Sequence, residues 1–236
     1  MQAGRHHGTT MGAETTSRTG PAGLTPRELR PFFHSLYRDA GLLQRFLAAW
    51  WPSLCPYEPI VRFVPAAARA FDFGCGSGTL LALLAATGRI STGVGCDISQ
   101  TAILAATRAE MHLPRGVLEF RTIADFSETP PGPFDLTLMI DVLHHIPPAR
   151  QKEAVLAAAR CVGAEGTLIY KDVAMRPAWR RWANTTHDLL LARQLVSYVL
   201  VGEVEHWLKE AGFALAHAES YSRLVYGHEL RVFRKN

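Results

Sequence analysis

The sequence lacks several features that define large classes of proteins. Its 236 residues include four cysteines, which form neither a CxxC pair nor the Cys/His spacing of a zinc site. We therefore expect free thiols, with no disulfide framework and no metal site. No run of about 18 uncharged apolar residues occurs, and the N-terminus has no signal-peptide core. These absences predict a cytoplasmic protein with no integral membrane segment.

A concentration of charge of one sign is also missing. The formal net charge is +4, from 25 basic and 21 acidic residues, and the basic residues form no long tract. This distribution argues against nucleic acid as a partner and is compatible with an anionic small molecule. At 48% hydrophobic residues, the chain is expected to bury a full globular core.

Composition and helix signals divide the chain into segments. Residues 1–24 are rich in Gly, Thr and Ser without apolar periodicity, and we expect a disordered tail there. A helical N-terminal extension is predicted over 25–64, where Thr25 is a suitable N-cap ahead of a proline. The main domain is expected over 65–236, with an inserted lid at 175–201.

Within the main domain, short β-branched runs alternate with alanine- and leucine-rich helical segments. Such alternation predicts a parallel sheet with helices on both faces. The expected strands are Ala70–Phe73, Thr92–Cys96, Leu118–Ile123, Phe134–Ile140 and Gly166–Val173. A helix over Gly202–Ala211 is then followed by two strands, Phe213–Ser220 and Glu229–Arg234. Their connection is too short for a helical crossover, so we expect them to pair antiparallel.

Three glycines, Gly74, Gly76 and Gly78, stand at alternate positions after the first expected strand. In a doubly wound sheet this edge binds ligands, and glycine lets a polar group approach the backbone at a helix N-terminus. Asp97 ends the second expected strand, where nucleotide-binding folds place an acid for ribose hydroxyls. The pattern predicts a nucleotide-like cofactor, and a tight turn without a ligand is the alternative.

The glycine spacing resembles the first motif of class I S-adenosylmethionine (SAM)-dependent methyltransferases. A nicotinamide fingerprint would need glycine where Thr79 stands, whereas here Asp72 precedes the glycines just inside the strand. Residues 134–146 look like that family's fourth-strand motif, and 163–168 look like its next turn, with Ala-Glu-Gly in place of Pro-Gly-Gly. The resemblance implies SAM as cofactor. It also implies an α/β fold with a doubly wound, seven-stranded, mostly parallel sheet whose last strand is antiparallel.

The resemblance also implies which residues hold the cofactor near the glycines. Asp72 and the turn after it would hold the methionine end of SAM. The turn residues concerned are Gly74, Cys75, Gly76 and Gly78. Asp97 would accept hydrogen bonds from both ribose hydroxyls, and Ile98 would pack on the adenine face.

Further along, the resemblance assigns two more pairs of residues. Asp125 would accept from the adenine amino group, with Phe126 alongside. Ile140 and Asp141 would border the methionyl group at the end of the fourth strand. For each of these acids, a helix N-cap or a solvated loop residue is the alternative interpretation.

Candidate catalytic residues should follow the fourth and fifth strands. His144 is a candidate general base, although a histidine here is often structural, and His145 beside it is expected to cap or pack. Lys171 and Asp172 end the fifth strand on opposite faces, so at most one should point at the reaction centre. Lys171 is the candidate substrate contact of the two.

The expected lid at 175–201 holds the remaining candidates. His187, Gln194 and Tyr198 share one helix face, which suggests a pocket wall with His187 as a basic or orienting group. Trp179 and Arg180 are further substrate candidates, one apolar and one anion-binding. The alternative is a buried helix whose polar atoms bond to neighbouring backbone.

These patterns predict methyl transfer from SAM to a small or lipid-like metabolite, on a hydroxyl oxygen, with an anionic or carrier-bound acceptor and a homodimer left open. A nicotinamide oxidoreductase and a nucleic-acid methyltransferase are the enzymatic alternatives. The second lacks support because no Asn-Pro-Pro-Tyr-like loop and no Pro-Cys pair occur. A catalytically silent SAM-binding partner protein is the third alternative.

Overall fold

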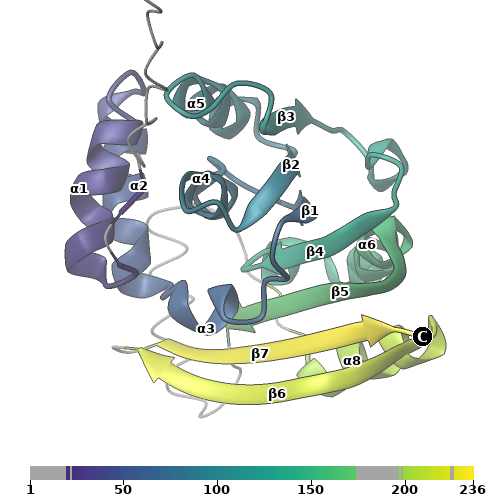
Figure 1. Cartoon of the computed structure of the whole chain (residues 1–236). Helices are drawn as coiled ribbons and strands as arrows, with labels where there is room; N and C mark the ends of the chain where they lie inside the picture. Colours follow the sequence, from purple (N-terminus) through teal and green to yellow (C-terminus); the bar gives the residue numbers. More distant parts are fainter. Residues whose placement is uncertain (1–19, 22, 174–196, 198, 224–225) are drawn as a thin grey trace, which may run out of the picture.

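The computed structural model describes residues 20–21, 23–173, 197, 199–223 and 226–236 (Figure 1). A seven-stranded sheet runs through its centre. The strands are β1 (Ala68–Phe73), β2 (Ile90–Asp97), β3 (Leu118–Thr122), β4 (Phe134–Ile140), β5 (Val162–Val173), β6 (Phe213–Arg223) and β7 (Tyr226–Lys235). Their order is β3-β2-β1-β4-β5-β7-β6.

All pairs among β1 to β5 are parallel, whereas β7 runs antiparallel to both β5 and β6. This confirms the predicted seven-stranded, mostly parallel sheet and the antiparallel final pair. The strands expected from runs of aliphatic and β-branched residues all form, and the central strands β1 and β4 bury most of their side chains between the two helical layers.

Helices cover both faces of the sheet (Figure 1). They are α1 (Pro26–Leu36), α2 (Leu42–Leu54), α3 (Glu58–Val61), α4 (Thr79–Ala86), α5 (Gln100–Glu110), α6 (Pro148–Cys161) and α8 (Val201–Glu210), with 3₁₀ turns η1 (Phe126–Glu128) and η2 (Leu143–His145). Buried residues of α1 to α4 share one hydrophobic cluster, and those of α6 and α8 share the other. Among the described residues, no helix is long and apolar enough to cross a membrane.

The first helix begins where its sequence signals predict. The Thr25 side chain accepts from the Glu28 backbone N–H at 3.4 Å, and the Glu28 carboxylate accepts from the Thr25 N–H at 3.1 Å. This capping box satisfies two backbone donors that a helix start otherwise leaves unpaired.

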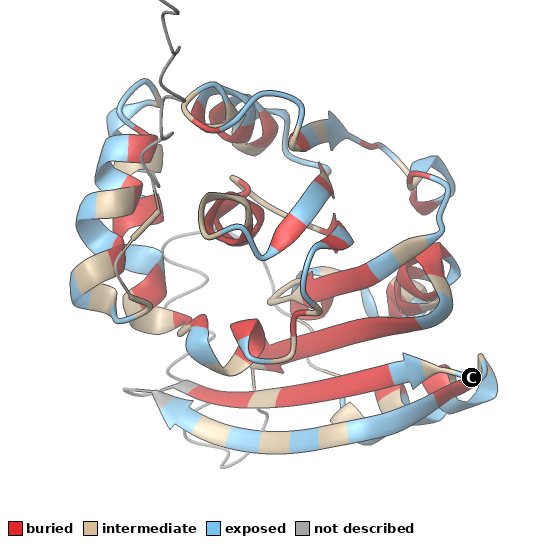
Figure 2. Cartoon of the chain, viewed as in Figure 1, coloured by how far each residue is buried: buried red, intermediate tan, exposed pale blue. Residues whose placement is uncertain are grey.

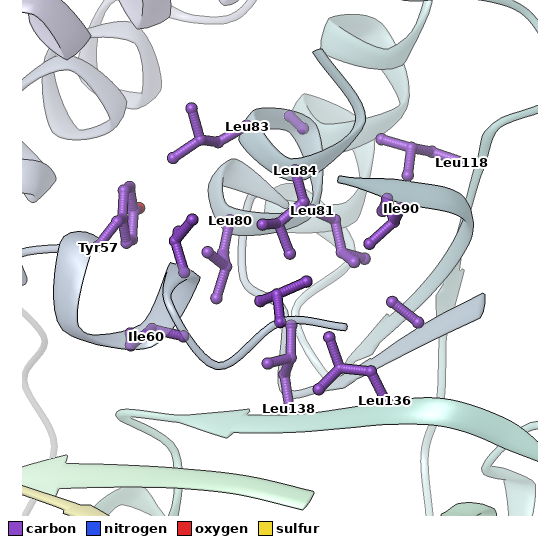
Figure 3. Packing of buried hydrophobic residues seen from close by; sticks show 14 of the residues in the cluster. Tyr57, Ile60, Leu80, Leu81, Leu83, Leu84, Ile90, Leu118, Leu136 and Leu138 are labelled. Carbon is purple, nitrogen blue, oxygen red and sulfur yellow. The ribbon is translucent and has the colours of Figure 1, made fainter. Parts of the chain in front are cut away.

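The helix α4 is buried nearly all round, and it anchors one half of the core. Leu81, Leu83 and Leu84 have no exposed surface, and Figure 3 shows α4 packed over the β4 side chains Leu136 and Leu138. Each buried leucine contributes roughly 1.5–3 kcal/mol of transfer free energy. Figure 2 shows the resulting buried centre, with exposed residues on the outer faces of α1, α5 and β6.

Strand β5 begins earlier than its sequence predicts. Val162 already pairs with Phe134, and the register then shifts before Leu136 pairs with Thr167. The turn expected before the strand is therefore a bulge within it, where Glu165 adopts a left-handed φ of 57°. The glycine that usually stands in such a turn is replaced here by a residue that tolerates the conformation less well.

Candidate active site

The glycine turn connects β1 to α4 at the carboxyl edge of the sheet. Gly74 N–H and Cys75 N–H both donate to the Cys96 carbonyl, at 2.8 and 2.9 Å, which ties the turn to the end of β2. Gly74, Gly76 and Gly78 have φ values of 74°, 54° and 74°. All three therefore occupy a backbone region that other residues adopt only with strain.

The three glycines make room for different neighbours. A Cβ on Gly74 would lie 2.5 Å from the Val142 side chain, and a Cβ on Gly78 would lie 2.6 Å from the Phe120 ring. A Cβ on Gly76 would meet no atom within 4 Å. Packing within the protein thus explains the absence of side chains at Gly74 and Gly78, and Gly76 alone faces open space.

Asp97 lies beside this open position. Its Oδ2 accepts from the Gly76 N–H at 2.9 Å, and its Oδ1 accepts from the Ser99 N–H at 2.8 Å. Each carboxylate oxygen can accept a second hydrogen bond, so capacity for a ligand hydroxyl remains. The next residue, Ile98, is 71% exposed and offers an apolar surface at the same rim.

Asp72 is buried beneath the turn, with 4% of its surface exposed. Burial raises the pKa of this carboxyl to about 7, and the charge of Asp97 adds to the rise. No described residue donates a hydrogen bond to it. A carboxylate held in this way favours a cationic ligand group, which would restore its usual ionisation.

Asp125 caps η1 and pairs with a neighbouring arginine. Its Oδ1 accepts from the Ser127 N–H at 3.0 Å, and its Oδ2 accepts from Arg150 at 2.7 Å. The Ser127 backbone bond and then Arg150 hold the pKa of Asp125 well below its usual range. Phe126 is buried, and the Arg150 guanidinium lies 4.3 Å from the centre of its ring. Asp125 therefore has the N-capping role given above as the alternative, and its second carboxylate oxygen pairs with Arg150.

Asp141 and Lys171 form a buried ion pair at the ends of β4 and β5. The Lys171 Nζ lies 2.7 Å and 2.5 Å from the two Asp141 oxygens and 3.3 Å from the Cys55 Sγ. Lys171 has no exposed surface. It thus faces Asp141 rather than open space, and this differs from the substrate contact expected for it. Ile140, which precedes Asp141, is half-buried against the core.

The attraction between Asp141 and Lys171 outweighs the tendency of burial to neutralise each of them. Burial alone would raise the pKa of Asp141, but Lys171, followed by His228, outweighs it and lowers that pKa. Burial would likewise lower the pKa of Lys171, and Asp141 reverses the effect and raises it. Burial raises the pKa of the Cys55 thiol to about 12 and lowers that of His228 to about 4. The cluster therefore holds one charge of each sign at neutral pH, beside a neutral thiol and a neutral imidazole.

His144 and Asp172 form a second buried pair on the other side of β5. The ring nitrogen Nδ1 of His144 contacts Asp172 Oδ1, and the backbone N–H of His144 donates to Asp172 Oδ2 at 3.3 Å. His144 is 5% exposed and Asp172 is 4% exposed. The His145 ring centre lies 4.0 Å from that of His144. A carboxylate thus fixes the ring of the candidate base through one nitrogen.

Two tyrosines at the ends of N-terminal helices contact the glycine turn and the first residue of α4. The Tyr37 hydroxyl donates to the Ser77 carbonyl at 2.5 Å, and the Tyr57 hydroxyl lies 2.7 Å from the Thr79 hydroxyl oxygen. Sequence patterns did not indicate either residue, because no local signal links a helix at residue 37 to a turn at residue 77. Both tyrosines are fully packed, with 1% of their surface exposed.

The candidates in the predicted lid lie outside the described residues. These are Trp179, Arg180, His187, Gln194 and Tyr198. Their assignments stay predictions.

Comparison with known proteins identifies the family of the chain. Residues 43–218 match a model of a methyltransferase domain. The ubiquinone biosynthesis O-methyltransferase of Saccharophagus degradans is 22% identical over 196 residues, 75% of this chain and 81% of that protein. The protein of the same name from Thiobacillus denitrificans is 26% identical over 206 residues, 78% of this chain and 85% of that protein.

Solved structures of low sequence identity share the fold. Magnesium protoporphyrin IX methyltransferase from Synechocystis PCC 6803 with bound SAH gives a TM-score of 0.60 at 18% identity, covering 93% of this chain and 91% of that one. A SAM-dependent methyltransferase from Mesorhizobium loti gives 0.60 at 19% identity, covering 76% and 97%. Because the domain model spans most of the sequence, the chain belongs to the methyltransferase-domain family and is a class I SAM-dependent methyltransferase.

Proposed function

We propose that this enzyme methylates a hydroxyl oxygen of a small or lipid-like metabolite, with His144 as the general base. The observation that carries the proposal is the buried contact between His144 Nδ1 and Asp172 at the ends of β4 and β5. The curated relatives at 22–26% identity, named as ubiquinone biosynthesis O-methyltransferases, support oxygen as the acceptor atom.

The residues of the glycine turn suit the cofactor. Gly76 is open to a ligand, Asp72 suits a cationic amino group, and Asp97 can accept from sugar hydroxyls beside the exposed Ile98. When bound, SAM supplies a methyl group activated by its positively charged sulfur. Asp125 and Asp141 are already paired with cations, so we assign them to shaping the site rather than to direct ligand bonds.

The chemistry assigned to the protein is removal of one proton. Asp172 fixes the Nδ1 nitrogen of His144 as the protonated one, which makes Nε2 the basic nitrogen of the ring. Nε2 would take the proton of the acceptor hydroxyl as the oxygen attacks. A positioned base of this kind contributes roughly 10²–10⁴-fold to a rate.

The experiment compares His144→Ala and Asp172→Asn with the wild type and with His206→Ala, a control at an exposed histidine of α8. Each is incubated with labelled SAM and a panel of phenols, hydroxy acids and carrier-bound acyl chains, and methylated products are identified by mass. We expect both site variants to lose roughly 10²–10⁴-fold in kcat, with SAM affinity by calorimetry unchanged. The loss should shrink as the pH approaches the pKa of the acceptor hydroxyl, since an ionised acceptor needs no base.

Full activity in both site variants would remove His144 from the mechanism. A wild type that binds SAM but methylates no acceptor of the panel would favour the silent-partner alternative. A parallel titration with nicotinamide cofactors separates the oxidoreductase alternative, because tight nicotinamide binding without SAM binding would contradict the proposal.

A further inference from the structure

Helix α2 exposes an apolar face that the catalytic site does not use. Six large apolar side chains of this helix are between 38% and 86% exposed, namely Leu42, Leu43, Phe46, Leu47, Trp50 and Trp51. Only small residues and a proline of α2 are buried, namely Ala48, Ala49 and Pro52. Single exposed leucines are ordinary, but a contiguous group on one 13-residue helix marks an interaction surface. We call these six residues the α2 face.

Cationic side chains border the α2 face. A cavity of about 450 Å³ between α1 and α2 is lined by both kinds of residue: Arg30, Pro31, His34, Leu42, Arg45, Phe46, Ala49 and Trp50. The Arg30 guanidinium lies 3.8 Å from the centre of the Trp50 ring, and Arg45 lies 2.9 Å from His34 Nδ1. Neither arginine pairs with a carboxylate among the described residues, and α2 contains no Asp or Glu. The surface thus combines an apolar centre with a rim of positive charge.

The positive charge of Arg30 and Arg45 indicates which kind of partner this surface can bind. A second copy docked by the same face would bring Arg30 and Arg45 of both chains together with no α2 carboxylate to compensate them. An anionic lipid surface complements both parts, since phosphate groups meet the arginines and acyl chains meet the leucines. Tryptophan beside arginine is also the combination that favours the boundary between headgroups and acyl chains.

We propose that the α2 face docks the enzyme on the surface of a bilayer that contains anionic phospholipids. The helix lies beside α1 at one side of the molecule (Figure 1), and the exposure of its large apolar side chains leaves them accessible to a surface. Its apolar residues would enter about 5–10 Å into the headgroup region, and the arginines would stay at the phosphates. The proposal does not depend on which atom or molecule the enzyme methylates.

Docking at this helix would also bring the catalytic site close to the bilayer. The C-terminal cap of α2 is Cys55, which contacts Lys171 at the end of β5. Tyr37 and Tyr57, on either side of α2 in the sequence, contact the glycine turn and the first residue of α4. The same helical unit therefore carries the docking face and touches the edge of the sheet where the chemistry is assigned.

The test is co-sedimentation of the full chain with vesicles of equal parts phosphatidylglycerol and phosphatidylcholine. The site variant is Leu43→Gln/Phe46→Gln, and the matched control is Leu104→Gln/Met111→Gln, which changes two similarly exposed apolar residues on and after α5. We expect the site variant to bind at least roughly tenfold more weakly and the control to bind like the wild type. Arg30→Gln should weaken binding to these vesicles, and raised salt should weaken binding of the wild type.

Three outcomes would overturn the proposal. One is wild-type protein that does not sediment with the mixed vesicles, and another is equal binding by site variant and control. The third is a stable wild-type dimer, detected by light scattering, that Leu43→Gln/Phe46→Gln dissociates, because the face would then be an interface between copies. Unchanged SAM affinity in each variant verifies folding, and Leu42→Gln, at the residue that is 86% exposed, serves if the double variant does not fold.

Discussion

Asp72 makes the stability of the enzyme depend on pH in an unusual direction. Its pKa is about 7 in the folded chain, against 3.8 for an unperturbed carboxyl. Between these values the folded state holds a proton that the unfolded state has lost, so the stability falls as the pH rises from about 4 to about 7. Above pH 7 both states are ionised, and the full cost of the buried charge is present.

Asp72→Asn is therefore expected to stabilise the protein without ligand at neutral pH. Relative to the wild type, its free energy of unfolding should rise between pH 4 and pH 7, by roughly 4 kcal/mol at most. Urea unfolding at pH 4.5 and pH 7.5 measures the difference. Asp135→Asn is the control with the opposite sign, because Arg69 lowers the pKa of that carboxyl. Parallel curves for wild type and Asp72→Asn would refute the assignment.

The glycines show how far individual residues can be interpreted from sequence. The spacing of Gly74, Gly76 and Gly78 predicted a bare turn, and all three do adopt left-handed φ values. The spacing could not show why each position needs glycine. A side chain at Gly74 or Gly78 would clash with Val142 or Phe120, and both of these residues lie far away in sequence. Only the folded structure shows whether a glycine leaves space for a ligand or for a side chain from elsewhere in the protein.

The ends of β4 and β5 are held together by the ion pair between Asp141 and Lys171. Removing one partner leaves a buried charge without compensation, which costs roughly 3–5 kcal/mol. Lys171→Met should therefore lower the free energy of unfolding by about that amount. Lys209→Met, at an exposed lysine of α8, should change it by no more than about 0.5 kcal/mol.

A double-mutant cycle measures the coupling in this pair. Asp141→Asn/Lys171→Met should recover part of the loss, because no charge is then left unpaired, and asparagine tolerates the left-handed φ of 55° at this position. Urea unfolding of the four proteins gives the coupling energy. If the two single changes were additive, the pair would contribute no specific stabilisation.

Strand periodicity predicted that neighbouring side chains of β5 point to opposite faces of the sheet. It did not predict which residues those side chains contact. Alternation sends Lys171 and Asp172 to opposite faces, and their contacts agree, with Cys55 on one side and His144 on the other. Lys171 was expected to contact a substrate because it ends β5, where at most one of the two polar side chains can point at the reaction centre. Its burial depends on Asp141 and on a helix more than a hundred positions earlier, and no local pattern encodes that proximity.

Tyr37 and Tyr57 connect the N-terminal helices to the glycine turn and to the first residue of α4. Tyr37→Phe/Tyr57→Phe removes the hydroxyl bonds to Ser77 in the glycine turn and to Thr79 at the start of α4, each worth about 1 kcal/mol. We expect a lower free energy of unfolding and SAM affinity reduced roughly fivefold for each lost bond, because the turn is less well ordered before binding.

Calorimetry with SAM gives the affinities, and Tyr221→Phe is the control. The Tyr221 hydroxyl is buried without a hydrogen-bond partner among the described residues, so its loss should leave SAM affinity unchanged. An affinity of the double variant equal to that of the control would show that the helices do not order the turn.

The overall architecture could be predicted from sequence where it follows a regular pattern of strands and helices. Alternating strands and helices predicted the parallel sheet, and the short final connection predicted the antiparallel pair. The packing of α1, α2 and α3 into the same hydrophobic cluster as α4 was not predicted, because amphipathic helices show which face is buried but not against which neighbour.

The position of β7 between β5 and β6 has a consequence for synthesis on the ribosome. While residues up to about 225 are emerging, the β5 backbone has an unpaired edge that only a much later segment can cover. Until β7 is available, β6 also lacks its partner, so both β5 and β6 expose backbone that could pair with another molecule.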